Sequence, residues 1–493
     1  MRIPFEPQLR LAATAVLDVR LNTNCRDEII PILAALQHIY GQPALRDELL
    51  DAVAHDVNGS SDPQRGRPGM HYWSILVLAA VRLGCNLNYD KLQNLAEEHR
   101  SLRNIMGIGG WDDEPSFDWR CIRDNVCLLL PETIERINHR IVAEGHRLVP
   151  EAAQTVRGDS FVVATNVHYP TDSSLIGDGL RRIVPLAVKL AHHFGIDGWR
   201  QHKHLLRAVK QQLRALNRIA ARKGPNYQSR LQHGYRTLLD LADRILTRAL
   251  DLLAPALLSI SPGEHAHQVN TLRDKLHHLL TLTLQVCDVA RRRVLQGETI
   301  AHDEKLFSLF EPETELILRG KTPHPVEFGH RVLVIEDGAG FVCHYTVMPR
   351  GVVDREIVVG EMKQLQERLE GRIQRASFDR GFHSPENQAA LTTLVAHPCL
   401  PKPGVHQAAQ QEREATVEFR ASRRRHAGIE SAIGALQSGN GLDRCRDRTF
   451  GGYCRYVGLG ILGRNLHVLG KLLLARADKT CAAGQSRRDH VAA

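Results

Sequence analysis

The residues of this chain that could do chemistry are carboxylates in places where acids are uncommon. Asp159 lies inside the strand-like stretch 155–169, and Asp379 directly follows another strand pattern at 373–378. Aspartate is depleted inside β-strands, so an acid at such a position needs a reason. Taken singly, each aspartate is explained at least as well by a turn or a cap. The two together direct attention to the elements that carry them.

A third carboxylate, Glu430, lies in a pattern that predicts one helix over 416–438. Arg423, His426 and Glu430 are spaced i, i+3 and i+7, which would place them on one face of that helix. A helical glutamate is commonly just solvated, but here basic side chains approach it. Three carboxylates without cysteine or paired histidine ligands suit hard cations such as Mg²⁺ or Mn²⁺. Two such ions would support cleavage or transfer of a phosphodiester.

The elements around these residues form an α/β pattern. Apolar periodicity predicts helices through most of 26–147, and these short helices fit a helix-turn-helix module or any small helical domain. Alternating apolar residues predict strands, and long helical patterns fill the interval between the first strand and the next. We therefore expect four segments: a helical domain at 1–150, an α/β domain at 151–180 plus 300–475, a basic helical insertion at 181–299 and a disordered tail at 476–493.

Local signals predict where several elements begin and end. Pro43 and Pro131 are suited to open helices, Gly84 to end one, and Ser101 to cap another. The pair Asp337-Gly338 predicts a turn between strands at 332–336 and 341–348. Breaks in the insertion are expected at 224–225 and 261–263. The glycines of GLGILG (458–463) match a dinucleotide-binding pattern, but they lie in an apolar helix, where close helix packing explains them better.

The positive charge of the chain is concentrated in the insertion. Lys and Arg number 64 against 55 Asp and Glu, and the window 200–239 holds ten Lys/Arg and no acid. Helical spacing puts six of these cations on one face: Lys203, Arg207, Lys210, Arg214, Arg218 and Arg222. A stripe of one sign suggests a surface for the phosphate backbone of DNA, although a solvated or partner-binding helix explains it equally well.

Composition narrows the class of protein. The chain has 493 residues, 43% of them hydrophobic and 24% charged, which is ordinary for a globular protein of two to four domains. Its longest wholly apolar stretch, near 73–81, is too short to cross a bilayer, and the N-terminus lacks a secretory pattern. None of the ten cysteines forms a CxxC pair, so structural zinc is not expected. We expect a cytoplasmic protein that is not bound to a membrane.

Four blocks of sequence carry a resemblance to a known family. They are GDSFVVATNVHYPTDSSLIGDGLR (158–181), SLFEPETELILRGK (308–321), FDRGFHSPEN (378–387) and RRRHAGIESAIGAL (423–436). In this order they resemble the DDE transposases of bacterial insertion sequences, in particular the ISNCY-type group. The similarity covers most of the chain, including the helical region at 67–110.

The resemblance implies an RNase H-like catalytic domain with Asp159, Asp379 and Glu430 as its metal-binding triad. In such domains the first Asp lies on the first strand, the second Asp follows the fourth strand, and the Glu lies on a later helix. Asp172, in PTDSS (170–174), is a rival first carboxylate, but it stands in a turn pattern rather than a strand. Related groups often carry Tyr-x2-Arg-x3-Glu-x6-Lys around the Glu. Here those positions are Arg423, His426, Glu430 and Gln437.

The same resemblance implies an activity and a set of partners. Water would cut the DNA strand at each element end, and the freed 3′-hydroxyl would attack target DNA, with two Mg²⁺ or Mn²⁺ ions as cofactors. The helices at 1–150 would read the terminal inverted repeats, and the insertion would hold flanking or target DNA. Arg380, Arg423 and His426 would contact DNA near the triad. Paired ends imply at least a homodimer, acting at the bacterial nucleoid.

Two alternatives stay open from the sequence. A repurposed transposase would bind DNA without cutting it, and an RNase H-fold endonuclease would cut without strand transfer. The chain has no Walker A sequence, so nothing in it supports ATP dependence.

Overall fold

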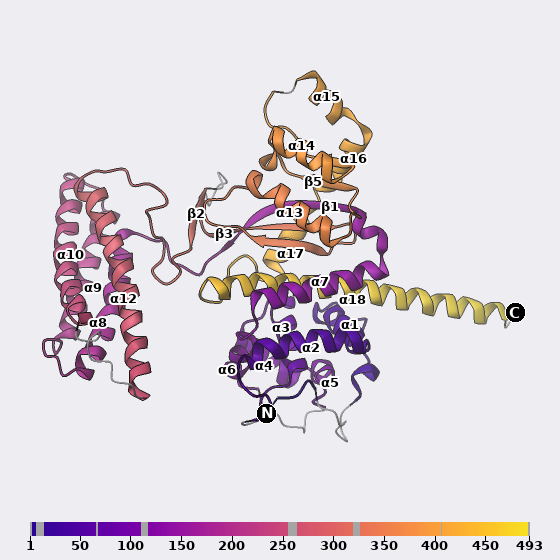
Figure 1. Ribbon diagram of the computed structural model, residues 1–493, viewed down its shortest axis with the longest axis horizontal. Helices are drawn as coiled ribbons and strands as arrows, with labels where there is room; N and C mark the ends of the chain where they lie inside the picture. The colour runs from indigo at the N-terminus through magenta and orange to yellow at the C-terminus, as the bar shows by residue number, and fades with distance from the viewer. Residues whose placement is uncertain are drawn as a thin grey trace. The chain divides into compact units, whose positions relative to one another are not determined.

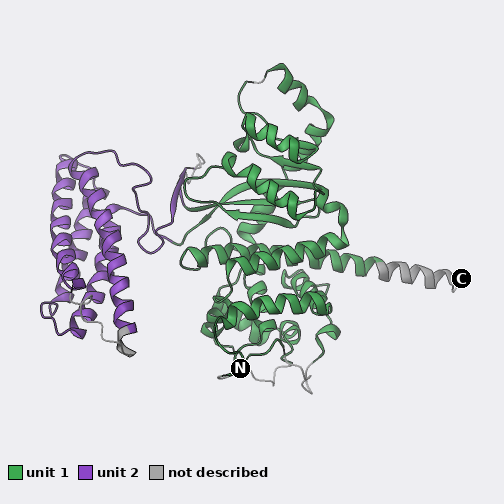
Figure 2. Cartoon of the chain, in the orientation of Figure 1, with its two compact units in different colours: residues 1–166, 329–493 green, residues 167–328 purple. Residues whose placement is uncertain are grey.

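The computed structural model describes residues 2–5, 14–65, 68–109, 117–254, 264–318, 326–405 and 407–491. The chain forms two compact units, shown in different colours in Figure 2. Unit 1 combines residues 1–166 with 329–493, and unit 2 comprises residues 167–328. The insertion expected at 181–299 lies inside unit 2. The N-terminal helices, which the sequence suggests as a domain of their own, share a continuous hydrophobic core with the sheet of unit 1.

The N-terminal part of unit 1 is helical, as predicted. Its helices are α1 (Ile29–Tyr40), α2 (Pro43–Asn58), α3 (Tyr72–Gly84), α4 (Tyr89–Glu98), α5 (Arg100–Ile105), α6 (Trp119–Val126) and α7 (Pro131–Leu148). Pro43 and Pro131 each occupy the first turn of their helix, where the missing N–H costs nothing. The prediction that Ser101 caps α5 is wrong, because the His99 side chain accepts the Leu102 N–H instead.

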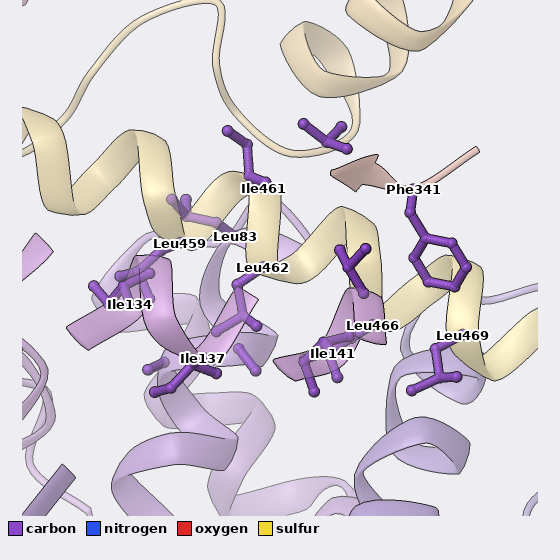
Figure 3. Packing of buried hydrophobic residues seen from close by; sticks show 14 of the residues in the cluster. Leu83, Ile134, Ile137, Ile141, Phe341, Leu459, Ile461, Leu462, Leu466 and Leu469 are labelled. Atoms are coloured by element: carbon purple, nitrogen blue, oxygen red, sulfur yellow. The ribbon is translucent and has the colours of Figure 1, made fainter. Parts of the chain in front are cut away.

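The long helix α18 (Phe450–Val491) lies at the centre of the core of unit 1. It packs against α1, α3 and α7, and Figure 3 shows the interlocked side chains. A Cβ atom at Gly463 would lie 2.5 Å from the Gly84 Cα, so this pair of glycines lets α18 and α3 touch backbone to backbone. This confirms close packing as the reason for the GLGILG glycines. Gly84 is the last residue of α3 rather than a stop after it.

Two properties of α18 differ from the sequence analysis. Its segment Phe450–Lys479 is long enough to span a bilayer and contains an 18-residue window with a mean hydropathy of 1.3, yet 67% of that window is buried inside the protein. A core helix has this same composition, because it is enclosed by other helices rather than by lipid. The tail expected to be disordered from residue 476 is instead a continuation of α18 to Val491, in keeping with its alanines and arginines, which favour helix.

A six-stranded mixed sheet follows the helices in the order β2-β3-β1-β5-β6, with β4 paired to β3. The strands are β1 (Thr155–Ala164), β2 (Glu315–Leu318), β3 (Val326–Asp337), β4 (Val342–Val347), β5 (Arg375–Phe378) and β6 (His397–Cys399). β1 is antiparallel to β3 and parallel to β5, and β5 is parallel to β6. The predicted turn between β3 and β4 is confirmed, and Asp337 Oδ1 accepts the Ala339 and Phe341 N–H groups.

Helices flank this sheet, which makes unit 1 a mixed α/β structure (Figure 1). They are α13 (Asp354–Arg368), α14 (Pro385–Leu394), α15 (Ala408–Ala415), α16 (Val417–His426) and α17 (Ile429–Ser438). α16 contacts β1, β5 and β6, and α17 contacts β1. The single helix predicted over 416–438 is wrong, because the chain breaks between α16 and α17.

The Arg157 side chain from β1 lies at this break. Its Nη1 donates to the Arg425 carbonyl at 2.8 Å, and its Nε donates to Glu336 Oε2 at 2.7 Å. The guanidinium fills the space where residue 428 would carry a Cβ, which would lie 2.1 Å from Nη1. Only glycine fits at 428 while Arg157 keeps these bonds. Such a contact between distant residues cannot be seen in local helical periodicity.

Unit 2 has a hydrophobic core of its own. Its described part contains α8 (Asp172–His193), α9 (His202–Ala221), α10 (Tyr227–Leu250), α12 (Glu264–Ala290) and a π-helical turn at Arg291–Leu295. The predicted break at 224–225 is confirmed, since it separates α9 from α10. The break predicted at 261–263 lies outside the described residues.

Replacing Gly428 by alanine should test the role of Arg157. We expect Gly428→Ala to lower the free energy of unfolding by about 1–2 kcal/mol, since it displaces a charge-assisted hydrogen-bond network. Gly434→Ala is the matched control in α17, because a Cβ there meets nothing within 4 Å. It should stabilise the helix by about 0.5–1 kcal/mol. Urea unfolding measures both, and equal stability of the two variants would contradict the steric conflict between Arg157 and a side chain at residue 428.

Candidate functional site

The register of β1 and β5 brings the two aspartates together. The strands pair in parallel with Arg157 opposite Ser377 and Gly158 opposite Phe378. One step further along each strand lie Asp159 and Asp379, and Asp379 keeps an extended backbone with φ −75° and ψ 170°. Adjacent strands are about 4.8 Å apart, and in-register residues of parallel strands project from the same face. The two carboxylates therefore stand side by side at the carboxyl end of β5.

A helix-capping role does not explain why an aspartate stands at position 379. It precedes the short 3-10 turn Arg380–Phe382, but its side chain makes no capping hydrogen bond there, and the residue is exposed. Asp159 is half-buried, and its Oδ1 accepts the neighbouring Ser160 N–H at 2.7 Å. Both carboxylates thus retain oxygen atoms for a ligand.

The pKa of Asp159 indicates that other carboxylates lie near it. The pKa of Asp159 is raised from 3.8 to about 6, first by burial and then by the negative charges of Asp379, Asp354 and Glu430, against the Ser160 N–H. Glu430, in the first turn of α17, is exposed. The structure therefore brings together all three carboxylates singled out in the sequence, although Glu430 follows a helix break.

Asp354 is a fourth carboxylate, which the sequence analysis missed. It is the first residue of α13 and half-buried, and its Oδ1 is buried without a hydrogen-bond partner. Its Oδ2 lies 3.8 Å from the position that a Cβ of Gly381 would take, beside the turn that follows Asp379. Acids are common in the first turn of helices, where they interact with the helix dipole. The sequence around Asp354 therefore gave no sign of a further role.

Among the basic residues predicted near the triad, His426 interacts electrostatically with two of the acids. Burial lowers its pKa, and the charges of Asp379 and Glu430 oppose that effect. The ring also interacts with the Ser377 backbone in β5, and its Nδ1 is buried without a partner. Because α16 ends at His426, the predicted shared helical face of Arg423, His426 and Glu430 is wrong. His426 reaches the acids through its packing on β5 instead.

The two arginines predicted near the triad are both exposed. Arg380 begins the turn after Asp379, and Arg423 lies on α16. Arg423 borders an open depression together with Val417, Arg420 and Arg424. Within the described residues, no acid forms a salt bridge with Arg420, Arg423 or Arg424. Their charges are available to an anionic ligand.

The donor set fits a hard divalent cation in its chemistry. All four carboxylates offer oxygen only, and a cation would relieve the repulsion that raises the pKa of Asp159. The described residues nevertheless contain no group of three or more His, Cys, Asp or Glu side chains already arranged for metal binding. The carboxylates thus lie within electrostatic range of one another without converging on one point.

In unit 2 the basic stripe lies on α9, as its spacing predicts. Its predicted DNA-contacting cations are all exposed: Lys203, Arg207, Lys210, Arg214 and Arg218. Arg222 follows the helix and is also exposed. The opposite face is anchored by Val209 and Leu216, both buried in the core of unit 2. Within the described ranges, no acid forms a salt bridge with these cations.

The rival carboxylate Asp172 already has a structural role. It is the first residue of α8, following a capping box in which the Thr171 side chain accepts the Ser174 N–H. Its Oδ2 accepts from Arg293 Nη2 at 2.6 Å and from Arg293 Nε at 2.9 Å. This pair satisfies the charge of Asp172 within unit 2.

The raised pKa of Asp159 predicts a pH dependence of stability. Between about pH 4 and pH 6 the folded chain binds more protons than the unfolded chain, so this group makes stability fall as pH rises. Asp159→Asn should therefore be more stable than the wild type by about 1–2 kcal/mol at pH 8, after allowance for partial solvent access, and equal to it at pH 4. Urea unfolding at both pH values measures the difference.

Asp172→Asn is the control for this experiment, because it breaks a pair with Arg293 instead of relieving repulsion. It should bring no gain at pH 8. A gain for Asp172→Asn equal to that for Asp159→Asn would contradict the carboxylate cluster.

Comparison of the chain with known protein families, with curated proteins and with solved structures gave no match. A functional assignment therefore rests on the geometry of the site.

Proposed function

We propose that this protein is a DNA transposase of the DDE type, which cuts DNA strands and transfers them through Asp159, Asp379 and Glu430. The main support is the register of β1 and β5, which sets two aspartates side by side with a helical glutamate in electrostatic range. Without the short β2, Asp159 is on the first strand in chain order and Asp379 follows the fourth. The strand order β4-β3-β1-β5-β6 also suits the RNase H-like domain that the sequence resemblance implies.

The same three carboxylates would hold Mg²⁺ or Mn²⁺, two ions by the resemblance. Bound there, the ions would stabilise the attacking and leaving oxygens of an in-line displacement at phosphorus. The chain itself contributes a cluster of negatively charged carboxylates, to which Asp354 adds a fourth charge. The phosphates of the DNA strand would be positioned by the basic residues around this cluster: His426, Arg380 and Arg423.

Double-stranded DNA is the proposed partner, as both element ends and target. The exposed cations of α9 suit its phosphate backbone, and the N-terminal helices would read the terminal repeats. Two element ends would be joined by at least two copies of the chain. The proposed site of action is the cytoplasm of a bacterial cell, at the nucleoid.

A second candidate function is DNA binding without cleavage, as in a repurposed transposase. It is favoured by one observation, that the described residues include no group already arranged for a metal ion. A nuclease that cuts without strand transfer would use the same carboxylates.

Cleavage of a plasmid that carries the gene's own flanking DNA tests the proposal. We expect the wild type to cut at the element ends only when Mg²⁺ or Mn²⁺ is present, and to join the freed ends to target DNA. Asp159→Asn, Asp379→Asn and Glu430→Gln should each abolish cleavage while DNA binding is kept, because they remove a ligand charge and preserve shape.

Asp172→Asn is the matched control and should cut like the wild type. Binding without cutting by the wild type would favour the repurposed protein, and cutting without joining would favour the nuclease. Full cleavage by any of the three triad variants would disprove its place in the site.

The basic stripe on α9 makes a separate prediction. Replacing Arg207, Lys210 and Arg214 by alanine should weaken DNA binding and flatten the dependence of log K on log salt by about 2–3, since each phosphate contact contributes about 0.9. A charge-matched control replaces three exposed cations elsewhere, Lys363, Arg372 and Lys471, and should leave the slope unchanged. Fluorescence anisotropy at several salt concentrations gives the slopes. The same slope for the α9 variant and the wild type would remove α9 from the DNA contact.

A further inference from the structure

Unit 2 contains a groove that the proposed function does not use. It lies along α8 and α12, which are neighbours in the core of unit 2 (Figure 1), and it has a volume of about 390 Å³. Four apolar residues form its floor: Pro185, Leu186, Leu279 and Phe310. The rest of its lining is basic: Arg181, Arg182, Lys189, Lys275 and His278. Among the described residues, no carboxylate lines the groove.

Part of the apolar floor is exposed to solvent. Pro185 is exposed in the interior of α8, where proline costs about 3 kcal/mol relative to alanine. Because proline has no N–H, the Arg181 carbonyl one turn earlier also loses its helical donor. Phe310 is 48% exposed beside this position. An exposed apolar patch with a polar rim is typical of a surface that binds a partner.

The rim carries charge of one sign. Lys189 and Lys275 are exposed, and within the described ranges neither has an acidic partner. Arg182 lies over the Phe310 ring, with 5.4 Å between its Cζ and the ring centroid. Arg181 is the exception, since it pairs with Asp178. The groove therefore presents an aliphatic floor between unneutralised cations.

We propose that this groove binds an acidic amphipathic helix of a protein partner. Apolar side chains along one face of such a helix would cover Pro185, Leu186 and Leu279, as in other helix-in-groove interfaces. Its carboxylates would pair with Lys189 and Lys275 at the rim.

Nucleic acid fits this groove less well. Duplex DNA presents phosphates to a protein surface and has nothing to cover an aliphatic floor. Bases of a single strand stack on open aromatic faces, but Arg182 already lies over the Phe310 ring. The combination of aliphatic floor and basic rim thus favours a peptide over DNA.

The test uses the full-length protein and a labelled helical peptide designed with leucine on one face and glutamate on the other. Fluorescence anisotropy should show binding of this peptide. An isomer with the same residues in a non-amphipathic order, and a version with lysine in place of glutamate, should each bind at least about tenfold more weakly. Duplex and single-stranded DNA serve as competitors.

The variant Lys189→Glu/Lys275→Glu should weaken peptide binding at least about tenfold, since it reverses the charge of the rim. Arg236→Glu/Arg244→Glu is the matched control, because it makes the same change of charge at exposed residues of α10 outside the groove. It should alter peptide binding less than about twofold.

Three outcomes would overturn the proposal. The first is no preference for the amphipathic peptide over its isomer, and the second is an equal loss in both double variants. The third is displacement of the peptide by DNA together with a loss of DNA binding in the rim variant, which would assign the groove to nucleic acid. None of them bears on cleavage by the triad, so this proposal and the transposase proposal can fail independently.

Discussion

The parallel pairing of β1 with β5 is the constraint on which the candidate site depends. A ladder of backbone hydrogen bonds fixes which residues stand opposite one another, and it sets Asp159 beside Asp379 although 219 positions separate them in the chain. A slip of one residue would turn one of the two carboxylates to the other face of the sheet. Burial raises the pKa of Asp159, and the negative charge of the neighbouring Asp379 raises it further. A site that holds mutually repelling carboxylates together is expected to bind a cation or to move a proton.

Arg157 extends the same constraint to the third carboxylate. It lies two residues before Asp159 on β1, and it joins Glu336 on β3 to the Arg425 carbonyl at the end of α16. Residue 428, between α16 and α17, is a glycine that leaves room for the guanidinium, and α17 then starts with Glu430 in its first turn. One strand thus carries the first acid and also the residue that shapes the approach of the third. On the helical side, α18 contacts α3 through Gly463 and Gly84 and also contacts β4 of this sheet.

The sequence predicted most elements of this structure because their signals are local. Apolar spacing and prolines indicated α2 and α7, and the alternation of residues indicated β1, β3 and β4. The one-signed face of α9 could also be predicted, since helical periodicity alone decides which residues share a face. Errors occurred at the ends of helical patterns. The break at Gly428 divides one predicted helix into two, and α18 extends beyond residue 476, where a disordered tail was expected.

The sequence by itself determined the type of chemistry that is available: acids in strand positions, a positive stripe on one helix, and no set of thiol ligands. Only the tertiary structure decided which acids meet. It placed Asp354 near the triad, paired Asp172 with Arg293, and brought His426 to the acids through β5 rather than through a shared helical face. The physical reason is that periodicity describes neighbours within one element. Contacts between elements depend on strand register and on the shapes of side chains that lie hundreds of residues apart.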